Sequence, residues 1–340
     1  GDGVGIDVTR EAVKVLRAVS EAHHLNLQLE ELDYGAERYL RDGTTLPGGE
    51  VDRLRREADA IFLGALGDPR IPDMRHGREI LLALRFELDL YINLRPARCL
   101  ADRFCPLKGK GAADVQWVVF RENTEGLYVG VGGNFKKGTP DEVAINEDIN
   151  TRKGVERIIR AAFAYAQAHG KKSVTMADKA NAVRFAHDLW TRTFAEVHRE
   201  YPRIKAEHFY ADALAMQMLR QPEHFEVIVT NNLFGDILSD IGAQLQGGLG
   251  MAPSAYINPG GLSLVEPVHG SAPKYAGKNT ANPVAAIMTV QMMLAHLGHA
   301  AAAAAVERAV LKAVDEDKLT RDVGGRLGTR EVGDFIASNV

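Results

Sequence analysis

Val227-Ile-Val-Thr-Asn-Asn-Leu-Phe-Gly-Asp236-Ile-Leu-Ser-Asp240 joins a short apolar run directly to a helical pattern. The run at 227–230 is apolar and rich in β-branched side chains, which is typical of a buried strand. The residues that follow it have the character of a helix start. A strand that passes directly into a helix is the repeating unit of α/β proteins.

The same alternation recurs along most of the chain. We predict buried strands at residues 60–63, 115–120, 173–176 and 227–230. We predict helices at residues 7–23, 152–168, 182–200 and 285–297. The alanine tract at 300–305 continues into valines at helical spacing, which indicates a further packed helix. The sequence therefore predicts an α/β fold with a central sheet flanked by helices.

The size and charge of the chain indicate two domains that act on small molecules. Its 340 residues, 46% of them hydrophobic and 25% charged, exceed what one core usually fills. The net charge is -4 and no run of Lys or Arg exceeds two residues. We therefore expect no nucleic-acid partner and no membrane-surface partner.

Other features of the sequence bear on the compartment and on the start of the chain. Cys99 and Cys105 lack metal-ligand spacing and a nearby histidine, so we expect unreactive thiols in a reducing compartment. No apolar run approaches the ~18 residues of a membrane span and no signal peptide is evident, so we expect a cytoplasmic protein. The chain opens on the turn-like Gly1-Asp2-Gly3-Val4-Gly5, and we expect a strand of about 5 residues to precede it.

Residues 132–151 interrupt the alternation. They contain Gly138, Pro140, several charges and a short alternating stretch around Val143 and Ile145. A protruding hairpin arm fits this pattern better than a core element, and such an arm often pairs with a second subunit. A solvated loop is the alternative that composition leaves open.

Asp236 and Asp240 are candidates for a metal site. They are four residues apart at a helix start, so both carboxylates project from one helix face about one turn apart. Mg²⁺ and Mn²⁺ prefer hard oxygen ligands and usually take few carboxylates from the protein. In the alternative interpretation, Asp236 favours the positive end of the helix and Asp240 is only solvated.

Basic and phenolic side chains near predicted element ends are candidates for substrate binding and proton transfer. Arg85, Arg95 and Arg121 lie at such boundaries, where a guanidinium suits bidentate carboxylate binding, although each alone could be a surface ion pair. Lys179 lies between a strand and a helix, where partial desolvation could adapt it to general-base work. Tyr128 is a candidate proton donor. The alternatives are that Lys179 is only a solvated lysine at a helix start and that Tyr128 only packs at the edge of the core.

Long motifs connect these candidates to a known family. Asn232 to Asp240 resembles the signature of the β-decarboxylating dehydrogenases, which include isopropylmalate, isocitrate, homoisocitrate, tartrate and D-malate dehydrogenases. Gly1 to Gly5, Arg121-Glu-Asn-Thr-Glu-Gly-Leu-Tyr128 and Glu266-Pro-Val-His-Gly-Ser-Ala-Pro273 resemble further family motifs. The resemblance therefore extends over essentially the whole chain.

The resemblance implies a two-domain fold of the isopropylmalate dehydrogenase type, which differs from the Rossmann fold. We expect a cofactor-binding domain at 1–90 plus 247–340 and a metal, substrate and dimerisation domain at 91–246, with the arm near 132–151. The dinucleotide would bind the Glu266–Asn282 loop instead of a G-x-G-x-x-G turn. The residues expected to contact it are Glu266, His269, Gly270, Ser271, Ala272, Lys274, Tyr275, Ala281 and Asn282.

The resemblance also implies oxidative decarboxylation of a 2-hydroxy diacid. Asp236, Asp240 and Asp212 would hold Mg²⁺ or Mn²⁺, which lowers the pKa of the substrate hydroxyl. Lys179 would accept the hydroxyl proton, and Tyr128 would protonate the enol after CO₂ leaves. In the family, Lys179, Asn181 and Asp212 reach the site from the neighbouring subunit. We therefore expect a homodimer with shared active sites.

The helix before Arg85 is the segment with which this family recognises the group on the third carbon of the substrate. Leu81 and Leu82 offer apolar surface there, which favours an isopropyl group over a carboxylate by a few kcal/mol. We therefore expect a 3-isopropylmalate dehydrogenase activity, as in leucine biosynthesis. Arg78 and Glu79 depart from the usual pattern, and core leucines are the alternative. Isocitrate, homoisocitrate, tartrate and D-malate stay open.

Lys274-Tyr275 bears on the choice between NAD and NADP. Family members that use NAD usually have an acid after Ser-Ala-Pro to accept bonds from the ribose hydroxyls, whereas Lys274 can pair with a 2′-phosphate. The Arg321-Asp322 region matches the other phosphate contacts only in part. We expect NADP to be used at least as well as NAD. A non-catalytic regulatory subunit and a hinged binding protein are the competing function classes.

Overall fold

The computed structural model describes residues 1–340, and the chain divides into two compact units. The first unit comprises residues 1–90, 98–112 and 243–340, and the second comprises 91–97 and 113–242. Residues 98–112, which the sequence-based division placed with the second domain, belong to the first unit. The functional roles expected of the two domains stay predictions.

The first unit contains three strands of the sheet. β10 (Ser263–Pro267) lies between β1 (Ala60–Phe62), to which it is parallel, and β9 (Pro253–Ile257), to which it is antiparallel. The longer helices of this unit are α1 (Val4–Ala22), α4 (Arg75–Glu87), α9 (Val284–His296), α10 (Ala300–Asp315) and α11 (Thr329–Ala337). Two short helices, α2 (Ala36–Asp42) and α3 (Glu50–Glu57), lie between α1 and β1 in the sequence. α9 is buried along most of its length, packing against α1, α10 and both β9 and β10.

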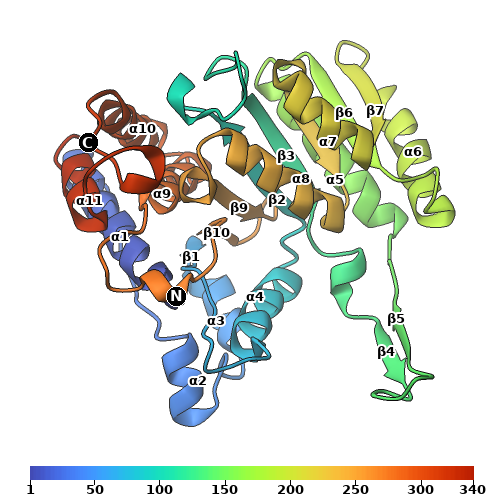
Figure 1. Cartoon of the computed structure of the whole chain (residues 1–340), viewed down its shortest axis with the longest axis horizontal. Coiled ribbons are helices and arrows are strands. Elements are labelled where there is room, and N and C mark those ends of the chain that lie inside the picture. The colour runs from blue at the N-terminus through green and yellow to red at the C-terminus, as the bar shows by residue number, and fades with distance from the viewer. The chain divides into compact units, whose positions relative to one another are not determined.

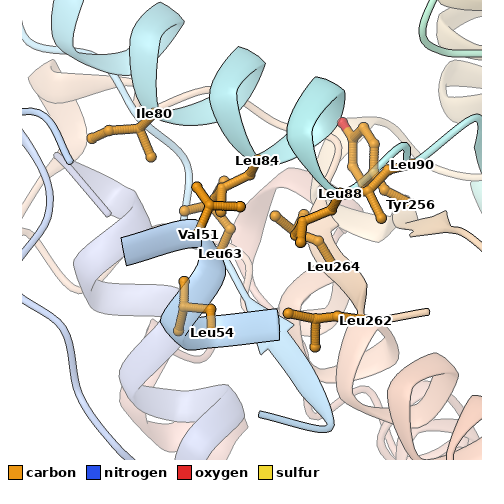
Figure 2. Packing of buried hydrophobic residues seen from close by; sticks show 10 residues of the cluster. All are labelled: Val51, Leu54, Leu63, Ile80, Leu84, Leu88, Leu90, Tyr256, Leu262 and Leu264. Atoms are coloured by element: carbon orange, nitrogen blue, oxygen red, sulfur yellow. The ribbon is translucent and has the colours of Figure 1, made fainter. Parts of the chain in front are cut away.

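A leucine-rich cluster anchors α4 to this sheet. Figure 2 shows Ile80 and Leu84 of α4, and Leu88 just after it, directed toward side chains of α3 and the strands. Leu264 in β10 is fully buried within the cluster. Leu81 is partly buried and packs against the cluster. Burying each such side chain stabilises the unit by roughly 1.5–3 kcal/mol. This cluster therefore fixes the helix on which Arg85 lies.

The second unit contains the other five strands, in the order β2-β3-β8-β6-β7. Their bounds are β2 (Ile92–Arg98), β3 (Gln116–Glu122), β8 (Val227–Thr230), β6 (Ser173–Asp178) and β7 (Lys205–Tyr210). β3, β8, β6 and β7 are mutually parallel. The carboxyl ends of parallel strands meet at one edge of a sheet, where ligands usually bind.

Four helices accompany these strands: α5 (Arg152–Ala168), α6 (Arg184–His198), α7 (Ala211–Arg220) and α8 (Asn232–Leu245). α5 packs against α6 and against β3, β8 and β6. α5 begins at the N-cap Thr151, whose hydroxyl accepts the backbone N–H of Gly154 at 3.0 Å.

Residues 132–146 form the expected hairpin arm. β4 (Gly132–Phe135) and β5 (Val143–Asn146) pair antiparallel, and all of their residues are exposed. The arm extends from the rest of the second unit as a thin ribbon (Figure 1). An isolated two-stranded ribbon is only marginally stable in water.

The predicted strands and helices are confirmed, with ends that differ by a few residues. The strand predicted at 115–120 is β3, and the helix predicted at 182–200 is the shorter α6. The alanine tract is the start of α10. None of the helices is at once long and apolar enough to cross a membrane. The architecture is mixed α/β with a sheet flanked by helices, as expected.

Candidate active site

Asp236 and Asp240 lie on α8, which follows β8 closely, and neither belongs to the first turn of the helix. Asn231 caps this helix, since its Oδ1 accepts the backbone N–H of Phe234 at 2.9 Å. The carboxylates are separated by one helical turn, as the sequence predicted. Burial raises the pKa of Asp240 above its ordinary value, neighbouring Asp236 raises it further, and Arg95 opposes both.

Asp236 is surrounded by donors from three other segments of the second unit. Arg121 donates from Nη1 to Oδ1 of Asp236 at 2.5 Å, and Arg95 Nη1 lies 3.2 Å from the same oxygen. The hydroxyl of Tyr128 donates to Oδ2 of Asp236 at 3.1 Å. Arg95 also donates to Ser239 at 2.8 Å. Two arginines, a tyrosine and two aspartates therefore converge at one place.

Arg121 is held at the end of β3 by a second set of bonds. Its side chain is only 2% exposed, and its Nε and Nη2 donate to Oδ1 of Asn232 at 3.1 and 2.7 Å. Asn232 in turn donates to the carbonyl of Glu125 at 2.9 Å. A Cβ on Gly235 would lie 2.5 Å from Cγ of Arg121, so only glycine lets α8 approach the aliphatic part of the Arg121 side chain this closely.

Glu122 organises the turn between Arg121 and Tyr128. Its buried carboxylate accepts the backbone N–H groups of Thr124 and Glu125 and the hydroxyl of Thr124, at 2.7 to 3.1 Å. Burial raises the pKa of this carboxyl, while those three donors lower it. Glu122, Asn232 and Gly235 received no role of their own from the sequence; the available signal was that all three lie within the family motifs Arg121–Tyr128 and Asn232–Asp240.

Lys179 and Asp212 form a separate pair in the same unit. Lys179 follows β6, and its Nζ donates to Oδ1 of Asp212 at 2.6 Å. Asp212 lies on the first turn of α7 and is 65% exposed, and the bond from Lys179 holds its pKa below the ordinary value. Asn181 is exposed on the turn that precedes α6.

The single chain does not gather a complete metal-ligand set. It has no group of three or more His, Cys, Asp or Glu side chains placed to hold a metal ion, so Asp212 is not brought together with Asp236 and Asp240. The two carboxylates on α8 nevertheless fit a hard divalent cation, because Mg²⁺ and Mn²⁺ prefer carboxylate oxygens.

The remaining substrate candidates lie on α4 in the first unit. Arg85 is buried, its guanidinium lies 5.4 Å from the ring centre of Tyr256, and its Nε has no hydrogen-bond partner. Such a buried cation suits an anionic ligand. Leu81 and Leu82 are both half-buried, and Leu81 packs against the core cluster. Of the two leucines, Leu82 is therefore the better candidate for contacting a substrate.

The Glu266–Asn282 loop begins at β10 and is fixed to its own unit at several points. Glu266 accepts a hydrogen bond from Tyr256, and Asn282 donates to Asp322 at 3.0 Å. The hydroxyl of Thr329 donates to the carbonyl of Ala281 at 2.6 Å.

The middle of this loop contacts the start of the chain. The carbonyl of Ser271 accepts the N–H of Val4 at 2.7 Å. Gly3 has φ +55, and a Cβ there would lie 2.2 Å from that carbonyl, so this approach requires glycine. The Gly1–Gly5 stretch is therefore a turn and helix start packed on the loop.

Several groups on the loop are available to a ligand. Nε2 of His269 is buried without a hydrogen-bond partner, and burial lowers the pKa of this histidine. Ala272 adopts a left-handed conformation at φ +36, and Gly270 borders open space. Lys274 is exposed, and its Nζ lies 4.7 Å from the ring centre of Tyr275.

Comparisons with known proteins agree with the motifs and the fold. A family model described as isocitrate/isopropylmalate dehydrogenase matches residues 1–336. A 3-isopropylmalate dehydrogenase of Thermobifida fusca is 44% identical over 342 residues, covering 100% of this chain and 96% of the relative. The corresponding Frankia casuarinae protein is 45% identical and covers 99% and 97%.

A solved structure also resembles this chain in sequence and in fold. The isocitrate dehydrogenase of Methylococcus capsulatus superimposes with a TM-score of 0.89 at 38% identity, covering 100% of this chain and 97% of that one. The chain thus belongs to the isocitrate/isopropylmalate dehydrogenase family. It is an enzyme, a decarboxylating dehydrogenase of the class that uses a nicotinamide dinucleotide and a divalent metal.

Replacing Arg121 by lysine tests how tightly β3 and α8 are coupled. Lysine cannot donate to Asn232 and Asp236 with one rigid fork, so we expect the free energy of unfolding to fall by roughly 1–3 kcal/mol. The matched control is Arg160→Lys, because Arg160 also pairs with a carboxylate, Glu200, but at an exposed site. Chemical denaturation of both variants should show a change below about 0.5 kcal/mol for the control. Equal losses would contradict this account of Arg121.

Proposed function

We propose that this enzyme oxidises and decarboxylates 3-isopropylmalate, the reaction named for its relatives in leucine biosynthesis. The observation that carries the proposal is the 44–45% identity to such dehydrogenases over almost the full length of both chains. Half-buried Leu82 on α4 supports it, because an apolar side chain near the third carbon favours an isopropyl group over a charged one.

The convergence of charges on α8 suggests how the substrate is held. Arg95 and Arg121 are placed to bind a carboxylate, and buried Arg85 is a further candidate for this role. Asp236 and Asp240 would hold Mg²⁺ or Mn²⁺ together with Asp212 of a second copy. When bound, the metal acidifies the hydroxyl and stabilises negative charge on oxygen, and the nicotinamide accepts the hydride.

Two side chains are suited to the proton transfers. Lys179 would remove the proton of the hydroxyl as a neutral amine, and its hydrogen bond to Asp212 fixes where Nζ lies. Tyr128 would return a proton to carbon after CO₂ leaves, and its hydroxyl already points at Asp236. Asn181, on the same turn as Lys179, would hydrogen-bond the substrate.

A homodimer would complete the site. α7 exposes Met216 and Leu219, at 64% and 49%, and α8 exposes Ile237 at 54%, which is unusual for side chains of this size. The arm exposes Phe135 and Ile145 as well. Covering these surfaces with a second copy would also bring an Asp212 and a Lys179 from another chain to the Asp236 pair.

A panel of diacids tests the proposed reaction. With Mn²⁺ and either nucleotide, we expect kcat/KM for 3-isopropylmalate to exceed that for isocitrate, homoisocitrate, D-malate and tartrate by at least about tenfold. Removing the metal with a chelator should abolish turnover, and adding Mn²⁺ should restore it. Faster turnover of isocitrate would contradict the role given to Leu82. Absence of turnover with every acid would favour a non-catalytic subunit.

We further propose that NADP is used at least as well as NAD. Exposed Lys274 can pair with a 2′-phosphate but cannot accept bonds from ribose hydroxyls. Its neighbour Tyr275 presents an exposed ring beside the same ammonium group. A kcat/KM for NAD more than tenfold above that for NADP would contradict this proposal.

Charge reversal at Lys274 tests whether this lysine determines the preference between NADP and NAD. We expect Lys274→Asp to shift the kcat/KM ratio of NADP to NAD at least about tenfold toward NAD, since aspartate repels phosphate and accepts ribose hydroxyls. The control is Lys312→Asp, because Lys312 is an exposed lysine on α10. Steady-state kinetics with both nucleotides should show an unchanged ratio for the control. An equal shift in both variants would indicate only a general charge effect.

A further inference from the structure

His187 on α6 is a buried polar side chain to which the proposed reaction assigns no role. It is only 1% exposed and lies on the first turn of the helix, within a ring of polar groups. Its Nδ1 accepts the backbone N–H of Lys179 at 2.7 Å. The bond therefore joins a fully buried imidazole to the residue proposed as the base.

The hydrogen-bonding groups around His187 define its tautomer. A neutral imidazole has one accepting nitrogen, and the N–H of Lys179 occupies Nδ1, so Nε2 carries the proton. Nε2 lies 3.6 Å from Oδ2 of Asp148, and the pKa of Asp148 is lowered first by its bond from His187. Asn231 Nδ2 also lies 3.2 Å from Nε2, but Oδ1 of Asn231 caps α8, so this contact brings two N–H groups together and is not a hydrogen bond when Nε2 carries the proton. The imidazole is thus oriented with its acceptor toward the Lys179 turn.

The turn at Lys179 depends on this acceptor. The carbonyl of Lys179 accepts the N–H groups of Ala182 and Val183, at 2.9 and 2.7 Å, so the turn closes on its own backbone. The N–H of Ala180 is satisfied by Asp178 at 2.8 Å. Only the N–H of Lys179 is held by a side chain of α6, and that bond sets the direction in which Lys179 leaves β6.

His187 also lies between elements that carry other parts of the proposed site. Its ring packs edge-on against the ring of Phe234 in α8, with 5.7 Å between the ring centres. Asp148 follows β5, the second strand of the arm. Asp148 accepts from Asn150 at 2.9 Å, and Asn150 accepts from Trp190 of α6 at 2.8 Å. The imidazole is therefore wedged between α8, the base of the arm and the Lys179 turn.

We propose that His187 is a positioning residue that aims Lys179 for proton abstraction, by accepting its backbone N–H from a site locked between α8 and the arm base. The inference rests on the proposed function of Lys179 as the base. Misplacing a catalytic group by about 1 Å can cost up to roughly a hundredfold in rate without weakening substrate binding. His187 therefore affects kcat far more than KM.

Three substitutions at one position test the proposal. His187→Ala removes the acceptor, and we expect kcat to fall roughly 10- to 100-fold with KM changed less than about threefold. His187→Asn keeps an acceptor at nearly the same distance from Cβ and should recover most of the loss. His187→Gln, the matched control, places its polar group near Nε2 and should not recover it. Equal activity of the Asn and Gln variants, or a His187→Ala enzyme as fast as wild type, would overturn the proposal.

Hydrogen exchange at the amide of Lys179 provides a readout that needs no substrate. We expect this amide to exchange at least about tenfold faster in His187→Ala and His187→Gln than in wild type, and slowly again in His187→Asn. Unchanged exchange in His187→Ala would overturn the role of His187. If wild type turns over no diacid, the proposed function fails, while the exchange rates still decide whether His187 holds the turn. Thermal unfolding of each variant separates local release of the turn from global loss of structure.

Discussion

The buried guanidinium of Arg121 is the constraint on which the second unit depends. A cation that is 2% exposed must be compensated by nearby acceptors, and two of the acceptors of Arg121, Asn232 and Asp236, come from the N-terminal half of α8. β8 must therefore end beside β3, and α8 must begin there with a glycine at 235 to admit the stem of Arg121. This charge pairing fixes the position of Asp236, one of the two carboxylates proposed to hold the metal.

The sequence predicted those parts of the structure whose signals are local. Apolar runs alternating with helical patterns correctly located β3, β6, β8 and the main helices, because burial imposes these periods on a chain. The spacing of Asp236 and Asp240 correctly placed both on one helix. Turn composition indicated the arm at 132–146. Long motifs indicated the family, and the comparisons confirm it.

What the sequence left unspecified depends on contacts between distant residues. The bond from Lys179 to His187 and the cap of Asn231 on α8 have no local pattern. Leu81 and Leu82 are adjacent and chemically identical, and only packing distinguishes Leu81, which contacts the core cluster, from Leu82, the proposed substrate contact. The incomplete metal set of one chain is likewise visible only in three dimensions, since spacing alone cannot show where Asp212 lies.

We propose that one chain supplies two different half-sites, Asp236 with Asp240 and Lys179 with Asp212, which only a second copy can join. The activity of mixed variants tests this dependence on a second copy. Lys179→Ala and Asp236→Ala, each inactive alone, should regain about a quarter of wild-type activity when unfolded and refolded together, because half of the dimers then contain one intact site. If mixed dimers form and stay as inactive as either parent, each site is built within one chain and the account is wrong.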